Sequence, residues 1–198
     1  MQKLIGILLS GMLLTACGGD DGHHHHSDMP DNHSHDEAGA EQIDQTRTIS
    51  DIPGEVASVF DGMLDDYLQM AGSLVEGDAV QSAAHGEQLR RATELFLQID
   101  MGQELAAQLE QTGAEILTHS ENISQESDVE EQRSTFENLS LGMITLVEKI
   151  GHQKNELYHQ RCPMVNGGNG DWLSTQEQIL NPYHGDRMLN CGSTVRVL

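Results

Sequence analysis

The chain has 198 residues and is strongly acidic, with 32 Asp and Glu against 10 Lys and Arg and a formal net charge of -22. A charge of this sign and size opposes binding to nucleic acid or to an anionic lipid surface, and it attracts cations. The length suits one domain of ordinary size together with a leader and a tail.

The N-terminal segment resembles a bacterial lipoprotein export signal. Lys3 supplies a positive charge, an apolar run covers residues 4–14, and the letters LTAC end at Cys17 like a lipobox. The apolar run is too short to span a bilayer as a permanent helix. We predict that residues 1–16 are a signal peptide and that Cys17 is lipidated. An ordinary secretory signal with a chance cysteine is the alternative. Gly18 after the cysteine resembles outer-membrane lipoproteins, which predicts a periplasmic protein anchored to the cell envelope at that membrane.

Residues 17–51 have the composition of a disordered tether. They carry almost no large apolar side chains, so they cannot bury enough surface to offset the entropy of ordering. Six of the 11 histidines fall here among acidic residues, and imidazole suits Cu, Zn and Ni. We predict a metal-scavenging tail of low specificity, with a polar spacer or a tag remnant as alternatives. Its predicted ligands are His23, His24, His25, His26, His33 and His35.

Residues 52–150 show the three- and four-residue apolar spacing of amphipathic helices. The pattern predicts helices over about 52–76, 79–99, 103–123 and 129–150. Asp78 and Asp128 are suited to cap the second and fourth helices, the latter with Glu131 in a variant of the capping box. The second helix is expected to turn inward the side chains of Val80, Ala84, Leu95, Phe96 and Ile99.

Four such helices joined by short breaks predict an all-α, up-and-down four-helix bundle within a domain at 52–198. After Gly151 the helical period stops. We expect residues 158–191 to be a folded loop with a short helix near 175–180, docked on the bundle by Trp172 and Leu173.

This C-terminal segment concentrates sulfur in two pairs, Cys162 with Met164 and Met188 with Cys191. Thiolate and thioether donors select Cu(I) and similar soft ions, so the four could form a metal site. His159 and His184 lie nearby in sequence and could complete it. Alternatively, the two cysteines form a disulfide in an oxidising compartment, which would stabilise the fold by roughly 3 to 4 kcal/mol. In a third interpretation the methionines are ordinary packing residues.

The letters CPM, a Gly-rich turn, DWLS, NPYHGDRML and NCG follow one another in this segment, and EEQRSTFENLS lies upstream at 130–140. Together they resemble the domain of unknown function 3347 family. Members of that family occur as free-standing exported proteins or fused to periplasmic adaptor subunits of heavy-metal efflux pumps of the copper and silver type. The resemblance implies a helical domain associated with metal handling, and it supplies no catalytic residue.

The leading hypothesis from the sequence is a lipid-anchored metal-handling protein that binds a soft ion, preferably copper, through the C-terminal sulfur cluster. The alternative is a disulfide-stapled structural or interaction module that docks on an envelope partner such as an efflux adaptor. An enzyme is not expected, because the chain has no nucleophile elbow, phosphate loop or HExxH spacing. Nucleic acid is not an expected partner.

Overall fold

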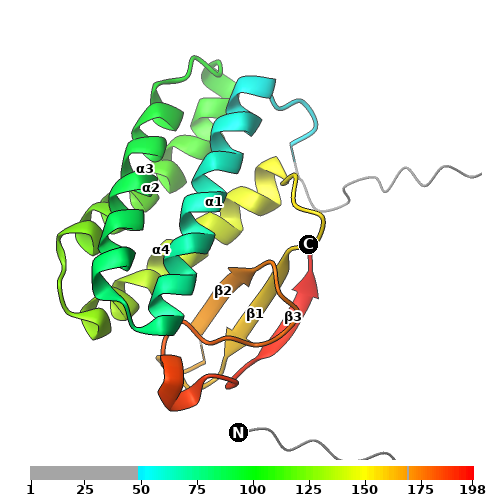
Figure 1. Cartoon of the computed structure of the whole chain (residues 1–198). Coiled ribbons are helices and arrows are strands. Elements are labelled where there is room, and N and C mark those ends of the chain that lie inside the picture. The colour runs from blue at the N-terminus through cyan, green and yellow to red at the C-terminus, as the bar shows by residue number, and fades with distance from the viewer. Residues whose placement is uncertain (1–48, 169) are drawn as a thin grey trace, which may run out of the picture. The chain divides into compact units, whose positions relative to one another are not determined.

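The structure is a computed structural model and describes residues 49–168 and 170–198 (Figure 1). The predicted signal peptide, Cys17 and the six tail histidines lie outside these residues. Four helices come first: α1 (Gly54–Glu76), α2 (Ala79–Gln98), α3 (Gln103–Gln125) and α4 (Val129–Ile150). Their bounds follow the predicted ones closely.

Two of the helices begin at the predicted aspartate caps. The Asp78 carboxylate accepts hydrogen bonds from the backbone N–H groups of Val80 at 3.1 Å and Gln81 at 3.0 Å. Asp128 does the same at the start of α4, accepting at 2.8 and 3.4 Å from the first residues of that helix. These bonds satisfy backbone donors that have no partner within the helix.

The helices pack in chain order, α1 on α2, α2 on α3 and α3 on α4. On α1 the apolar side chains that recur every three or four residues are all buried: Val56, Phe60, Met63, Tyr67, Ala71 and Leu74. Met70 and Met143 join them in the core, so most of the bundle's methionines are packing residues. The part of the chain that the structure describes contains no helix of the length and apolarity needed to cross a membrane.

The predicted inner face of α2 is partly wrong. Val80 and Leu95 are 77% and 60% exposed, although Phe96 is fully buried. The buried positions of α2 are instead Ser82, Gly86, Leu89, Thr93 and Phe96, and the small Gly86 lies where α2 and α3 approach closely. A Cβ added at Gly86 would lie 3.2 Å from the carbonyl oxygen of Ser120 on α3. The positions of the apolar residues alone therefore do not predict which side of α2 faces the core.

The all-α prediction also needs correction, because the C-terminal segment forms a small antiparallel sheet beside the bundle. Its strands are β1 (Tyr158–Cys162), β2 (Gly170–Ser174) and β3 (Ser193–Val197), in the order β2-β1-β3. No helix forms at 175–180; a short 3₁₀ helix, η1 (Gly185–Met188), follows instead. The fold is therefore mainly helical, with four packed helices and a three-stranded sheet.

The sheet lies beside α1 and α4 (Figure 1). Trp172 and Leu173 on β2 are 1% and 0% exposed, which confirms them as docking residues. The Leu173 backbone N–H donates to the Tyr67 hydroxyl at 3.1 Å, and this hydroxyl is also 2.8 Å from the Ser140 hydroxyl on α4. Tyr67 thus joins both helices to the sheet.

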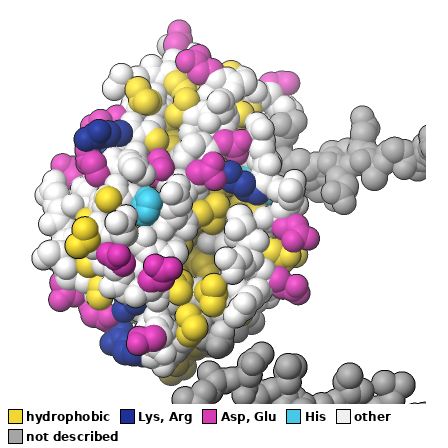
Figure 2. All heavy atoms as spheres, viewed as in Figure 1, with side chains coloured by type: hydrophobic (Ala, Val, Ile, Leu, Met, Phe, Trp, Pro, Cys, Tyr) yellow, Lys and Arg dark blue, Asp and Glu magenta, His cyan; other side chains and the backbone are white. Residues whose placement is uncertain are grey.

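Acidic side chains are spread over the visible face of the molecule, with few Lys and Arg among them (Figure 2). Helices α1 and α3 contain no Lys or Arg at all. The acidity inferred from composition is therefore also a property of the folded surface.

Candidate functional site

The two C-terminal cysteines meet. Cys162 ends the central strand β1, and Cys191 follows η1, yet their sulfur atoms lie 3.0 Å apart. Both are free cysteines in the structure. Cys162 is 0% exposed, whereas Cys191 is only half-buried. The fold therefore brings together the pair that the sequence singled out, with one sulfur on the inside and one nearer the solvent.

The backbone around Cys191 is held on both sides. Its N–H donates to the carbonyl oxygen of Met188 at 2.9 Å, and its own carbonyl oxygen accepts from the Asn181 side-chain amide at 3.0 Å. The next residue, Gly192, has a φ of 142°, and a Cβ there would lie 2.8 Å from the carbonyl oxygen of Arg161. These backbone contacts hold Cys191 in place opposite Cys162.

The contact between the sulfurs also sets the acidity of Cys191. The hydrogen bond with Cys162 raises the pKa of the Cys191 thiol above its ordinary value, and burial acts in the same direction. Reactive cysteines usually have a lowered pKa, because the thiolate is the nucleophile. Cys191 therefore lacks the lowered pKa that is usual for a reactive cysteine.

The two methionines of the predicted cluster lie at the surface. Met164 is 64% exposed and Met188 is 37% exposed. Neither side chain belongs to the hydrophobic core, unlike Met63 and Met70 in the bundle. Exposed thioethers are available either to a metal ion or to a partner surface.

His159 is engaged elsewhere. Its Nε2 is hydrogen-bonded to the Asp171 carboxylate, which also accepts from Arg161 Nε at 2.9 and 3.0 Å. Because side chains alternate along a strand, His159 and Cys162 point to opposite faces of β1. The loop expected from the sequence would have allowed them to converge, and the strand separates them.

A hollow of about 360 Å³ lies between α4 and the segment around η1. Met164 and His184, two of the predicted ligands, both line it. The His184 Nε2 atom is buried and has no hydrogen-bond partner among the described residues. The full lining is Glu130, Arg133, Ser134, Glu137, Met164, Val165, Asn166, Tyr183, His184 and Arg187. These residues come from the same blocks of sequence that carry the family resemblance, so those blocks meet at one place.

Arg133 organises this hollow, and the sequence analysis did not identify it. The side chain is nearly buried, with 7% of the residue exposed. Its guanidinium donates to the carbonyl oxygens of Pro182 at 3.0 Å and Leu74 at 2.6 Å. Arg133 therefore ties α4 to the end of α1 and to the turn before η1. An available signal was its spacing: it lies four residues after Val129 and three before Phe136, on the apolar face of α4.

Glu130 lies between two arginines at the rim of the hollow. It accepts from Arg133 at 2.6 Å and from Arg187 at 2.5 Å. Burial alone would raise the pKa of Glu130, but the hydrogen bonds from Arg187 and Arg133 outweigh it, so its pKa is lowered. The rim therefore carries three charged side chains, with Glu130 paired to both Arg133 and Arg187.

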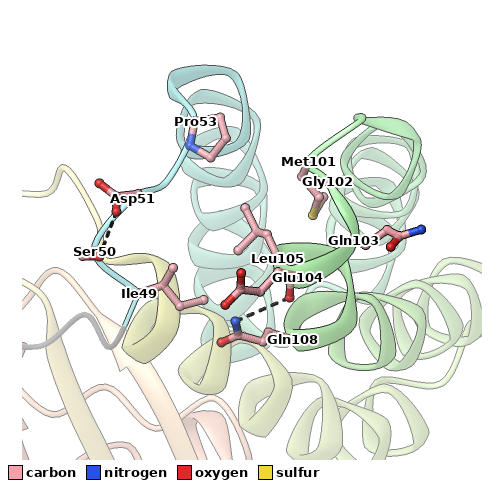
Figure 3. Close-up of a pocket in the computed structure, with 10 residues that line it drawn as sticks. All are labelled: Ile49, Ser50, Asp51, Pro53, Met101, Gly102, Gln103, Glu104, Leu105 and Gln108. Atoms are coloured by element: carbon pink, nitrogen blue, oxygen red, sulfur yellow. Dashed lines mark hydrogen bonds between the residues drawn. The ribbon is translucent and has the colours of Figure 1, made fainter.

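A second hollow, of about 370 Å³, lies where α1 and α3 begin (Figure 3). Its lining includes Asp51, Met101 and Glu104 but none of the predicted site residues. Across residues 49–168 and 170–198, no group of three or more His, Cys, Asp or Glu side chains is placed to hold a metal ion. Four of the six ligands predicted in the C-terminal segment lie either in the cysteine pair or in the α4 hollow, so these two places are the candidate site.

Residues 63–155 match the model of a family described as protein of unknown function (DUF3347). The matched segment runs from within α1 to just beyond α4, and it supports the domain family that the motifs resemble. No curated protein and no solved structure matches the chain.

Proposed function

We propose that this chain is a non-enzymatic binding module of the bacterial cell envelope, anchored by a lipid on Cys17 and stapled by a disulfide between Cys162 and Cys191. It docks on an envelope partner such as a heavy-metal efflux adaptor. The observation that carries the proposal is the 3.0 Å contact between the two cysteine sulfurs. Two thiols already in contact need only lose their protons and two electrons to become bonded.

The disulfide would constrain residues that line the hollow. The loop between the cysteines contains Met164, Tyr183, His184 and Arg187, which all line it. Closing a loop of this length stabilises the folded state by roughly 3 to 4 kcal/mol in the chain-entropy model. The disulfide therefore fixes the segment that faces α4.

The rim of the hollow has the chemistry of a docking surface. Met164 is 64% exposed, and methionine adapts its shape to varied partners. Glu130 and Arg187 are each about half-exposed and offer charges of both signs beside it. Methionine and arginine are among the residues enriched at protein interfaces, whose rims are polar.

Site-specific photocrosslinking in intact cells tests the docking. A photoreactive residue at Met164 should give a discrete crosslinked product, whose mass-spectrometric identification should show an envelope protein. The matched control is Val80, which is 77% exposed on α2, outside the hollow. The same product from both positions, or none from Met164, would contradict docking at the hollow.

The anchor has its own test. Replacing Cys17 with Ser removes the atom that would be acylated, so we expect the precursor to stay uncleaved or to be mislocalised. The folded domain should be unaffected. A variant that fractionates with outer membranes as the parent does would contradict the lipid anchor.

Soft-metal binding, preferably of copper, is the second candidate function. It is favoured by the meeting of Met164 and His184 in one hollow and by the contact of the two thiols. In their reduced form Cys162 and Cys191 would hold the ion as thiolates, with Met164, Met188 or His184 as further donors. The His-rich tail would raise the local concentration of ions.

A Cu(I) titration separates the two candidates. The sample is the mature, reduced protein in which the six tail histidines are replaced by Asn, compared with the same protein carrying Met164→Leu and Met188→Leu. Tight uptake that weakens in the second protein would establish the metal site. No uptake would leave the stapled module as the function. Leucine is close to methionine in size, so the fold should lose less than about 1.5 kcal/mol per site.

A further inference from the structure

We infer that the two cysteines are a substrate pair for thiol–disulfide exchange, in which Cys191 meets the oxidant and Cys162 closes the bond. The inference rests on the proposed disulfide and assigns a role to each sulfur. The oxidant is a dithiol/disulfide oxidoreductase, the chemical class that oxidises exported chains in a compartment where disulfides persist.

The different burial of the two residues sets their order of reaction. Exchange needs the attacking sulfur, the attacked sulfur and the leaving sulfur to approach one another directly. Cys162 is 0% exposed at the end of the central strand, where it pairs with Gly170. Cys191 is half-buried on the loop after η1. A disulfide of another protein therefore reaches Cys191 first.

Two steps balance the chemistry. In the first, the Cys191 thiolate attacks one sulfur of the oxidant's disulfide, forming a mixed disulfide and releasing the oxidant's other sulfur as a thiolate. In the second, the Cys162 thiolate attacks the Cys191 sulfur and expels the oxidant's remaining thiolate. Cys162 and Cys191 lose two protons and two electrons in total, and the oxidant's disulfide is reduced to a dithiol.

The fold prepares the second step. The hydrogen bonds from Cys191 N–H to Met188 and from the Asn181 side chain to Cys191 keep the two sulfurs facing each other. Attack by Cys162 is thus intramolecular, with the entropy of approach already lost on folding. The mixed disulfide should be short-lived in the parent protein and should persist only when Cys162 is absent.

The test uses the reduced mature protein and oxidised glutathione as the probe. Cys162→Ser should accumulate glutathione on Cys191. In folded Cys191→Ser, Cys162 should react at least about tenfold more slowly, because it is reached only through local opening. Adding urea to Cys191→Ser should abolish this protection, which controls for the intrinsic reactivity of its thiol. The parent should form the Cys162–Cys191 disulfide without a lasting adduct.

The outcomes distinguish the order in which the cysteines react from the formation of the disulfide. Equal rates of adduct formation in the two folded variants would overturn the order of reaction while leaving the disulfide intact. A parent that keeps a stable adduct on Cys191 and never closes the bond would overturn the staple itself. If the serine variants fail to fold by circular dichroism, brief alkylation of the reduced parent with iodoacetamide, read by peptide mass, gives the same comparison. Cys191 should then label first, and labelling of Cys162 at the same rate would overturn the inference.

Discussion

Replacing Arg133 with Met should release the C-terminal segment from the bundle. The substitution keeps an unbranched apolar stem but removes the donors to the carbonyl oxygens of Pro182 and Leu74. Hydrogen bonds from a charged group are worth roughly 1.5 to 3 kcal/mol each. The Leu74 oxygen keeps its bond from Gly77 N–H at 3.2 Å, so the Pro182 oxygen loses more.

The expected total is a loss of about 3 kcal/mol in the free energy of unfolding, to which the half-exposed Glu130 adds little. For a domain of this size, this lowers Tm by roughly 6 to 12 °C. Urea denaturation should be followed by two probes, far-ultraviolet circular dichroism for the helices and fluorescence of Trp172 for the docked sheet. Trp172 is the only tryptophan and is 1% exposed. In the variant its transition should precede that of the helices.

Arg91→Met is the matched control. Arg91 is 70% exposed on α2, and its ion pair with Glu87 lies at the surface, so the expected change is below about 0.5 kcal/mol. If Arg133→Met is no more destabilising than this control, Arg133 does not hold the segment, and the reasoning about the hollow is refuted.

Three further predictions concern neighbouring contacts. Tyr67→Phe leaves the buried Leu173 N–H without its acceptor and should cost about 1 to 2 kcal/mol in urea unfolding, so an unchanged midpoint would contradict the link to the sheet. Gly185→Ala, at a φ of 53°, places a Cβ against the Arg133 guanidinium and 2.9 Å from the Val75 carbonyl oxygen. It should cost roughly 2 kcal/mol, with a smaller effect when Arg133 is already Met because only the backbone contact then remains. The pKa of Glu130 is lowered on folding from its ordinary value of 4.5, so its stabilisation is present above that value and is lost as pH falls through the lower folded pKa. Acid titration of Tm should therefore show a steeper loss in the parent than in Glu130→Gln, and parallel curves would contradict the pairing.

The helical part of the fold was predictable because its signals are long and redundant. Each helix repeats its apolar face over about six turns, and Asp78 and Asp128 mark two of the starts. The exception is α2, where Gly86 faces α3 and the polar Ser82 and Thr93 are also buried. Close approach of two helices depends on both partners, so the composition of one helix does not reveal it.

The sheet could not be predicted in the same way. Its strands are five residues each, and β1 buries Tyr158, His159 and Gln160 in succession, so its exposure does not alternate. The buried His159 is hydrogen-bonded to the Asp171 side chain, and the buried Gln160 donates hydrogen bonds to the backbone of residues 176 and 177. Such burial of polar residues depends on partners that only the folded chain supplies.

The candidate site was partly predictable. The number of cysteines left after the predicted lipidation of Cys17 predicts that Cys162 and Cys191 act as a pair, and the structure brings them together. Proximity in sequence groups the histidines with the cysteines, but successive side chains of a strand point to opposite faces. His159 therefore points away from Cys162, while His184 joins Met164 in the hollow. The position of Arg133 on the apolar face of α4 indicates burial, but its role depends on the carbonyl oxygens of Pro182 and Leu74, which only the folded chain brings to it.

The redox state of Cys162 and Cys191 in the native envelope tests the central claim most directly. Cells are quenched in acid, free thiols are alkylated, and the mature protein is digested without reduction and examined by mass spectrometry. The proposal predicts a linked pair of peptides joining Cys162 to Cys191, lacking two hydrogens and carrying no alkyl group, and this pair should persist when cells are grown with added copper. Both cysteines alkylated in protein taken from the oxidising compartment would contradict the stapled module.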